Sequence, residues 1–519
     1  MPKGRRCLKD DSDEAAECPL IVIQHSWKTV AASLALTSLL SACAVGPDYR
    51  PPAAGALSVP QGYDTPLAPQ PASDPAALAA YWQAFNDPAL NTLIMQAIAS
   101  NLDIVQAQAR LRQARESLVQ ANASFLPQIG ASGSAGKNYR NQGSGTRVDD
   151  NGNIISTGSG KFSSAYSVGA NASWQVDLFG ELSRSAEAAR ADLEGSGYSL
   201  ANVRITIIAE LVTNYVQARL TQEQLRITRE QLGNQQDNYD IARWRLQAGL
   251  VSSLDEQQAR AQLAQTTASV PQLETSLRGS LNRIAVLTGQ APGEATRSLE
   301  TPAPIPVAAG SVTAGIPADT LRQRPDVRSA ERALAAATAR IGVAEAQLYP
   351  ALGISGNIGT SSSAFGSLFS LITGGLFANV QQVIFDGGRL RSQARAQKAA
   401  TDGAFAAYKA SVLGALEDVE NAIASLNGAQ VRAEQFAIAY DAANNSAILA
   451  RSQYRAGLTD FQTLLTTENT LLSAGNSLAS ARADKATALI QLYSALGGGW
   501  QDMDLTGAAG AADSNGTTP

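Results

Sequence analysis

The fold is decided by the stretch DIVQAQARLRQARESLVQANASFLPQIGASGSAG, residues 103–136, because the chain contains a second version of it. The segment DVRSAERALAAATARIGVAEAQLYPALGISGNIG, residues 326–359, aligns with it without gaps and pairs Pro127 with Pro350. In both copies a helical apolar pattern ends near the proline, and the alternating pattern of a β-strand follows. The chain is therefore an internal duplication of one helix-and-strand unit.

A second pair of segments extends the duplication toward the C-terminus. QAGLVSSLDEQQARAQL, residues 247–263, aligns with RAGLTDFQTLLTTENTL, residues 455–471. This offset is 455 minus 247, or 208, whereas the first offset is 326 minus 103, or 223. The 15 extra residues of repeat 1 lie between about 137 and 170, where NQGSGTRVDDNGNIISTGSG reads as a long polar loop.

The clearest strand pattern runs from Tyr166 to Leu178, with apolar residues on one face and polar residues on the other. This pattern is typical of a transmembrane β-barrel, in which about 9–11 residues cross the hydrocarbon. A hairpin on a soluble protein is the alternative. We expect four strands, at about 128–139, 164–178, 351–361 and 375–386. Four strands cannot close a barrel, and lipid does not tolerate open sheet edges, so several copies must build it together.

Two long helical hairpins are expected after the strands. Outgoing helices are predicted at about 184–247 and 390–455, and return helices at about 252–289 and 460–496. An outgoing helix of 60 or more residues spans about 90–100 Å. Both turns carry the letters AGL, in which Gly249 and Gly457 can take the positive φ that ends a helix, followed by Leu250 and Leu458. Pro271 is expected to bend or break the first return helix.

The N-terminal region has the features of an export signal. TVAASLALTSLL, residues 29–40, follows Lys28 and is too short for a transmembrane helix, so we assign residues 1–42 to a cleaved signal peptide whose start is uncertain. Leu40 to Cys43, LSAC, resembles the lipobox of bacterial lipoproteins. That resemblance implies S-diacylglycerol and an N-acyl chain such as palmitate on Cys43.

Composition excludes several classes of function. The single histidine, His25, and two of the three cysteines precede Cys43, so a mature chain that begins there has no histidine and no free thiol. The commonest general base, metal ligand and sulfur nucleophile are then missing, and we expect no enzyme, no cofactor and no metal site. The net charge of -5, with scattered Lys and Arg, argues against a nucleic-acid partner.

Three segments together carry a resemblance to a known family. They are GIPADTLRQRPDVRSAERALAAATARIGVAEAQLYP (315–350), the two AGL turns and CAVGPDYRPP (43–52). They resemble the TolC-type outer-membrane efflux factors, in particular the lipoprotein branch, NodT and OprM-like, that serves resistance-nodulation-division pumps. The resemblance implies a mainly α chain with a β-barrel part. In a homotrimer, twelve strands would form one barrel in the outer membrane, and twelve helices a tunnel across the periplasm.

The resemblance also implies a domain plan and a role. Repeat 1 (86–291) and repeat 2 (323–500) would form the barrel and tunnel, and segments 43–85 and 292–322 would add to an equatorial region. The C-terminal segment 501–519 is expected to be a disordered tail. The assembled channel would be a passive exit duct for drugs or other small molecules delivered by an inner-membrane pump and a periplasmic adaptor.

The family closes its tunnel near the helix turns. Its gating aspartate falls on Asp255 and its tyrosine partner on Tyr454, which could form a charge-assisted hydrogen bond. Equally, Asp255 could serve the start of the following helix, where a carboxylate is favoured.

The chain departs from the family near the second turn. Thr463 and Thr466 stand where some members carry acidic residues, and Thr459 stands where a basic gate residue falls. Asp460 is the nearby candidate to replace the missing charge. The resemblance therefore does not extend to a cation-selective constriction at this turn.

Two alternatives stay open at this point. One is an exit channel of the same fold for type I secretion or metal efflux, although only Met95 and Met503 remain in the mature chain and no Met-rich copper site is present. The other is a lipoprotein that forms a periplasmic coiled coil without a pore. That reading accounts for the helices but not for the alternating hairpins.

Overall fold

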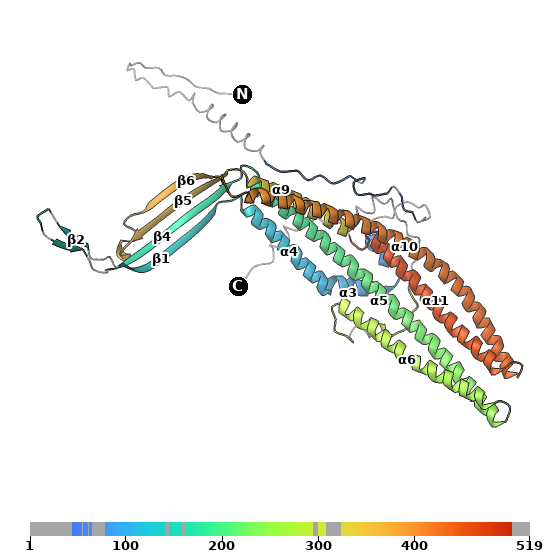
Figure 1. Cartoon of the computed structure of the whole chain (residues 1–519). Helices are drawn as coiled ribbons and strands as arrows, with labels where there is room; N and C mark the ends of the chain where they lie inside the picture. Colours follow the sequence, from blue (N-terminus) through green and yellow to red (C-terminus); the bar gives the residue numbers. More distant parts are fainter. Residues whose placement is uncertain are drawn as a thin grey trace, which may run out of the picture.

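The computed structural model describes residues 44–53, 55–60, 62–64, 78–140, 145–148, 150–152, 154–157, 161–293, 299–307 and 323–500. The signal peptide, Cys43, most of segment 292–322 and the tail 501–519 lie outside the described residues. The molecule is elongated, with a β-sheet at one end and the turns of two helical hairpins at the other (Figure 1).

One antiparallel sheet contains four strands in the order β1-β4-β5-β6. Their bounds are Gln128–Arg140, Lys161–Val176, Ala351–Ser362 and Thr373–Gln381. Each repeat supplies one hairpin, and the two hairpins join where Asn171 of β4 pairs with Asn357 of β5. Strands β1 and β6 are the two edges of a sheet that the described chain does not close.

Strand β6 ends at Gln381, earlier than the expected limit near 386. The reason is local, because the Asp386 side chain accepts hydrogen bonds from the backbone amides of Gly388 (2.9 Å) and Leu390 (2.8 Å). These bonds satisfy amide groups at the start of the next helix, so residues near 386 belong to a helix entry and not to a strand.

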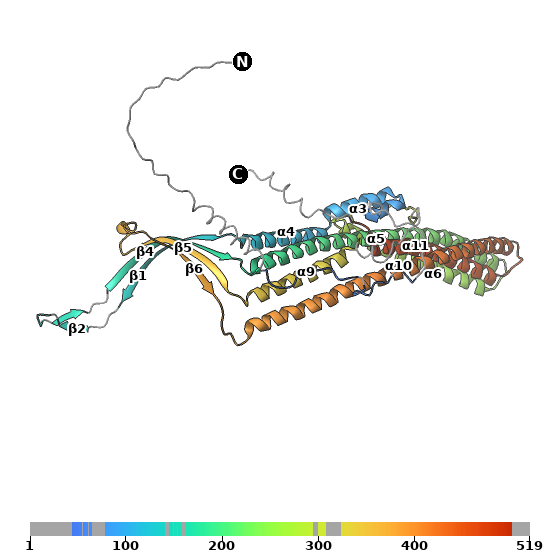
Figure 2. The same cartoon turned by 90° about the horizontal axis from the view of Figure 1, so that it is seen from above.

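The extra residues of repeat 1 form a small hairpin of their own. Strands β2 (Gly145–Val148) and β3 (Ile154–Thr157) pair as a separate two-stranded sheet beyond the far end of β1 and β4, as Figures 1 and 2 show. The sequence predicts a loop here, so that prediction is wrong for the paired residues. In repeat 2 the matching connection holds only the short 3-10 helix η2 (Phe365–Ser367).

The helices repeat in the same order as the strands. Short helices α4 (Leu102–Ala123) and α9 (Pro325–Ala346) enter the sheet; α5 (Glu181–Gln247) and α10 (Arg389–Arg455) leave it; and α6 (Ser253–Leu287) and α11 (Phe461–Ala495) return. The outgoing helices have 67 residues each, or about 100 Å. Helix α6 runs through Pro271 without the expected break. None of the described helices has an apolar stretch suited to crossing a membrane.

The largest core lies beside the middle of α5. An apolar stripe of α5 is buried there, with Ile208, Leu211, Val212 and Tyr215 completely inaccessible. Helices η1 (Tyr81–Phe85) and α3 (Pro88–Ser100) add further apolar side chains to this core. Many buried side chains of α10 and α11 are instead alanines, which permit close helix approach: Ala443, Ala447, Ala450, Ala481 and Ala488.

Candidate functional site

The two faces of the four-stranded sheet have opposite chemistry. One face, which we call the polar face, comprises four rows of residues paired across the strands: Gln128, Ser173, Ser355 and Phe377; Gly130, Asn171, Asn357 and Gly375; Ser132, Gly169, Gly359 and Thr373; and Gln175, Gly353 and Asn379. Directly paired residues point to the same side, so these rows form one surface. None of the side chains in these rows is charged.

The opposite face is apolar and exposed. Ile129 and Leu376 are each 79% exposed, and Val380 is 70% exposed, because nothing in the described chain covers them. An exposed apolar face of this extent needs a partner, and a lipid bilayer is one that tolerates it.

Aromatic side chains stand at both ends of this apolar face. At one end the rings of Tyr139 and Phe162 lie 5.0 Å apart, and Lys137 Nζ lies 5.3 Å from the centre of the Phe162 ring. At the other end Trp174 Nε1 donates a hydrogen bond to the carbonyl oxygen of Phe125 at 2.9 Å. Aromatic girdles of this kind mark the two membrane–water boundaries of outer-membrane barrels.

The helix turns lie at the end of the molecule opposite the sheet. Gly249 (φ 73°) and Gly457 (φ 75°) take left-handed conformations, and the amide of the leucine that follows each donates back to the end of the preceding helix. These are Schellman motifs, which end a helix tightly. Leu250 is 73% exposed and Leu458 is 79% exposed, so both turns present a leucine outward.

Tyr454 lies buried just before the second turn. Its ring packs against Phe461 at 5.7 Å between centroids, and the Arg245 guanidinium lies 4.5 Å above it. Arg245 Nη2 also donates to the Tyr454 carbonyl oxygen at 2.8 Å, which joins the end of α5 to the end of α10. Sequence reasoning missed Arg245; the only local signal was a basic residue in the last turn of a helix, where carbonyl groups need donors.

The expected bond between Tyr454 and Asp255 is not formed within the described chain, where the Tyr454 hydroxyl has no hydrogen-bond partner. Burial raises the pKa of Tyr454, the nearby Asp255 carboxylate raises it further, and Arg245 opposes both. No direct hydrogen bond therefore joins the two side chains in the described chain. Asp255 stands in the first turn of α6, in agreement with the helix-start reading.

Asp460 is the N-cap of α11. Its Oδ1 accepts a hydrogen bond from the Thr463 amide at 2.7 Å, and this bond holds the pKa of Asp460 below its usual value. Thr466 is exposed, and its hydroxyl donates to the Gln462 carbonyl oxygen at 2.8 Å. In the described chain these side chains therefore serve their own helix.

A buried ion pair links three helices farther from the turns. Glu468 of α11 is 1% exposed and receives Arg451 Nε of α10 at 2.5 Å and Gln231 Nε2 of α5 at 2.6 Å. Both carboxylate oxygens are thus occupied by donors. Nothing in the local sequence pattern predicted this cluster.

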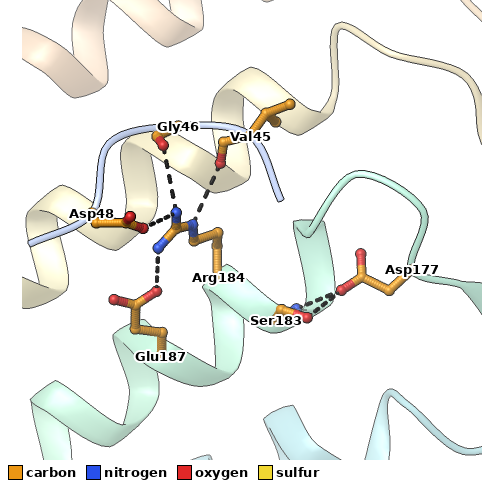
Figure 3. A network of polar contacts seen from close by, with 7 residues as sticks. All are labelled: Val45, Gly46, Asp48, Asp177, Ser183, Arg184 and Glu187. Atoms are coloured by element: carbon orange, nitrogen blue, oxygen red, sulfur yellow. Dashed lines mark hydrogen bonds and ion pairs between the residues drawn. The ribbon is translucent and has the colours of Figure 1, made fainter. Parts of the chain in front are cut away.

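The segment that follows Cys43 is fixed to the base of the sheet. Residues 44–53, the N-terminal strap, begin where β4 leads into α5, and the Val45 amide donates to the Phe179 carbonyl oxygen at 3.1 Å. Farther along the strap, the Tyr49 hydroxyl donates to Glu331 of α9 at 3.1 Å. Arg184 of α5 donates to Asp48 Oδ1 at 2.6 Å and to Glu187 Oε2 at 2.7 Å (Figure 3). The same guanidinium contacts the carbonyl oxygens of Val45 and Gly46, each at 3.4 Å.

Charge and shape both hold the strap. The Arg184 hydrogen bond keeps the pKa of Asp48 below its usual value. Gly46 has φ 95°, and a Cβ there would lie 2.5 Å from the Gly342 Cα of α9. The strap therefore touches helices from both repeats, and only glycine fits at position 46.

No group of three or more His, Cys, Asp or Glu side chains is placed to hold a metal ion in the part of the chain that the structure describes. The geometry instead provides a sheet with one polar and one apolar face, long helices, and exposed turns. These are surfaces for a membrane and for other proteins.

Comparisons with known proteins identify the family. Residues 93–290 and 316–498 match the model of the family described as "Outer membrane efflux protein". Nodulation protein T of Rhizobium leguminosarum bv. viciae is 35% identical over 412 residues, which cover 78% of this chain and 79% of that protein. The pyoverdine export outer membrane protein OpmQ of Pseudomonas aeruginosa is 30% identical over 432 residues, or 83% of this chain and 89% of that protein.

Solved structures agree with these relatives. The outer-membrane channel OprN superimposes with a TM-score of 0.76 at 33% sequence identity, covering 89% of this chain and all of that one. The four-stranded sheet is then the β-barrel part of this fold. The chain belongs to the outer membrane efflux protein family and is an efflux channel of the outer membrane.

Proposed function

We propose that three copies of the chain form a passive exit duct, in which twelve strands close a barrel and twelve helices form a tunnel through the periplasm. One observation carries the proposal. The sheet has a lipid-type face, but β1 and β6 are left as open edges, and lipid does not tolerate open edges. Pairing β6 of one copy with β1 of the next satisfies both edges and places the polar face around the lumen.

Substitution on the two faces tests the proposal. Leu376→Arg places a charge on the lipid side, at a cost of about 2–4 kcal/mol per copy near the bilayer centre, whereas Asn379→Arg places it on the lumen side of the same strand. We expect heat-resistant trimers and single-channel conductance from Asn379→Arg but not from Leu376→Arg. Equal behaviour of the two variants would reject this orientation, and would favour the soluble-hairpin or pore-free coiled-coil alternatives.

The periplasmic partners are proposed to be an adaptor protein that meets the exposed Leu250 and Leu458 turns and, behind it, an inner-membrane pump of the resistance-nodulation-division class. The pump would supply the energy, so the channel needs no catalytic group. Loss of adaptor crosslinking in Leu250→Ser and Leu458→Ser, with trimers intact, would support this contact. Unchanged crosslinking in both variants would place the adaptor elsewhere.

We further propose that Cys43 carries the diacylglycerol and acyl chains expected from its lipobox, and anchors the chain in the inner leaflet of the outer membrane. Support comes from the N-terminal strap, which begins one residue later and is held beside Phe179 at the base of the sheet. Mass spectrometry of the mature N-terminal peptide tests the modification. An unmodified peptide that retains residues before Cys43 would reject it.

A further inference from the structure

One side chain breaks the polar character of the polar face. Phe377 of β6 pairs with Ser355, so it points to the same side as the asparagines of that face, and it is 58% exposed. Its ring leans over Gly375: a Cβ at position 375 would lie 2.7 Å from Phe377 Cζ and 3.4 Å from Asn357 Oδ1. The ring therefore rests in a recess that exists because residue 375 has no side chain.

Packing within one copy of the chain does not account for this ring. The Phe377 ring belongs to none of the buried apolar clusters of the described residues, and it points away from the lipid side, where Leu376 and Val380 are exposed. An aromatic ring that faces water loses the free energy that burial would give it. This loss of free energy has an explanation if the ring contacts solutes that pass through the lumen.

The surroundings of Phe377 define what it can recognise. The neighbouring rows of the polar face offer amide and hydroxyl groups, with Asn357 beside the ring and Asn379 two residues farther along the same strand. Because none of these groups is charged, the part of the wall around Phe377 does not select strongly by the sign of a solute. The ring contributes stacking instead, which favours planar aromatic groups.

We propose that Phe377, seated over Gly375 and beside Asn357, is a contact site on the lumen wall for aromatic solutes of either charge. This inference rests on the proposed trimer, which sets three such rings at one height in the barrel. Contact at each ring is weak and short-lived, as passage through a duct requires.

Saturation-transfer NMR on trimers in lipid nanodiscs tests the site with two ring-bearing probes of opposite charge, benzyltrimethylammonium and benzenesulfonate. Empty nanodiscs give the lipid background. Phe377→Ser is expected to lower the ring-proton signal of both probes by about two- to tenfold, the range that an aromatic pair contributes, and Phe377→Trp to restore it. Phe369→Ser, which removes an exposed ring from the β5–β6 connection, is the matched control and is expected to change little.

The outcomes separate the inference from the proposed function. Intact trimers with equal signals for wild type and Phe377→Ser overturn the contact site alone. A loss for only one probe overturns the claim that charge is immaterial. Failure of the wild-type chain to form trimers overturns the proposed function itself. Gly375→Ala provides a second check, because its Cβ displaces the ring; it should reduce both signals while the trimer persists.

Discussion

Arg451 and Glu468 form an ion pair of 2.5 Å between Nε and Oε1, and the Glu468 side chain is 1% exposed while that of Arg451 is 23% exposed. The pair joins the outgoing and return helices of repeat 2. Gln231 adds a hydrogen bond from repeat 1, so this layer fixes how the two helical hairpins lie against each other.

Breaking this pair from one side should cost more than removing it. Arg451→Met leaves a buried carboxylate without its cation, which costs about 3–5 kcal/mol, whereas Arg451→Met with Glu468→Met leaves no charge behind. We expect the single variant to lower the heat-dissociation temperature of the trimer and the double variant to recover most of the loss. Equal losses in the two would mean that the pair contributes only packing.

The closed conformation of the turn of repeat 2 should depend on Arg245 more than on the Tyr454 hydroxyl. Arg245→Ala removes the contact with the Tyr454 ring and the hydrogen bond to its carbonyl oxygen, whereas Tyr454→Phe removes a hydroxyl that has no partner in the described chain. In planar bilayers we expect conductance to rise with Arg245→Ala and to stay near wild type with Tyr454→Phe.

Arg243→Ala is the matched control for this experiment, because Arg243 lies on the same helix but pairs with Asp240 of its own helix. The reverse result, a rise with Tyr454→Phe only, would return the gate to the Tyr454–Asp255 contact that the family resemblance implies.

The N-terminal strap should loosen when Gly46 gains a side chain. Gly46→Ala requires a Cβ 2.5 Å from Gly342 Cα and an unfavourable positive φ, whereas Gly55→Ala meets no atom within 4 Å. Limited proteolysis of folded trimers should therefore cut the strap faster in Gly46→Ala than in Gly55→Ala. Identical cutting would show that the Arg184 contacts hold the strap by themselves.

Alkaline pH should destabilise the core beside α5. Burial, and then a 2.5 Å hydrogen bond to Asp87, raise the pKa of Tyr215 to about 12, although Arg219 opposes the shift. Above the unfolded value of 10.0 the unfolded chain releases this proton while the folded chain keeps it, so stability falls as pH rises toward 12. Below pH 10 the contribution is fully present.

Thermal unfolding between pH 8 and about 11 checks this expectation with Tyr215→Phe beside wild type. The variant is less stable at pH 8, because it removes the donor to the Oδ2 atom of Asp87, but the difference should narrow as pH rises. A constant difference across the range would show that Tyr215 does not titrate with unfolding.

The repeats, strands and hairpins could be predicted because each leaves a local signal. Pro127 and Pro350 follow the ends of helices, and Gly249 and Gly457 end helices in tight turns. These signals act locally and do not depend on the rest of the fold. The contacts of Arg184 with Asp48 and of Arg245 with Tyr454 join residues 136 and 209 positions apart, and no periodicity encodes such pairs. The position of Phe377 could be predicted from the sequence, because alternation along β6 places it on the other face of the sheet from Leu376 and Val380.

The hairpin β2–β3 gives the two repeats unequal connections at the end of the sheet away from the helices. Around the mouth of the proposed trimer, three tall projections would alternate with three low ones. The wall beneath has nearly sixfold regularity, but its outermost surface has only threefold regularity. An antibody or phage protein that approaches from outside would therefore have three equivalent binding sites and not six. Shortening the β2–β3 hairpin would remove all three without changing the barrel strands.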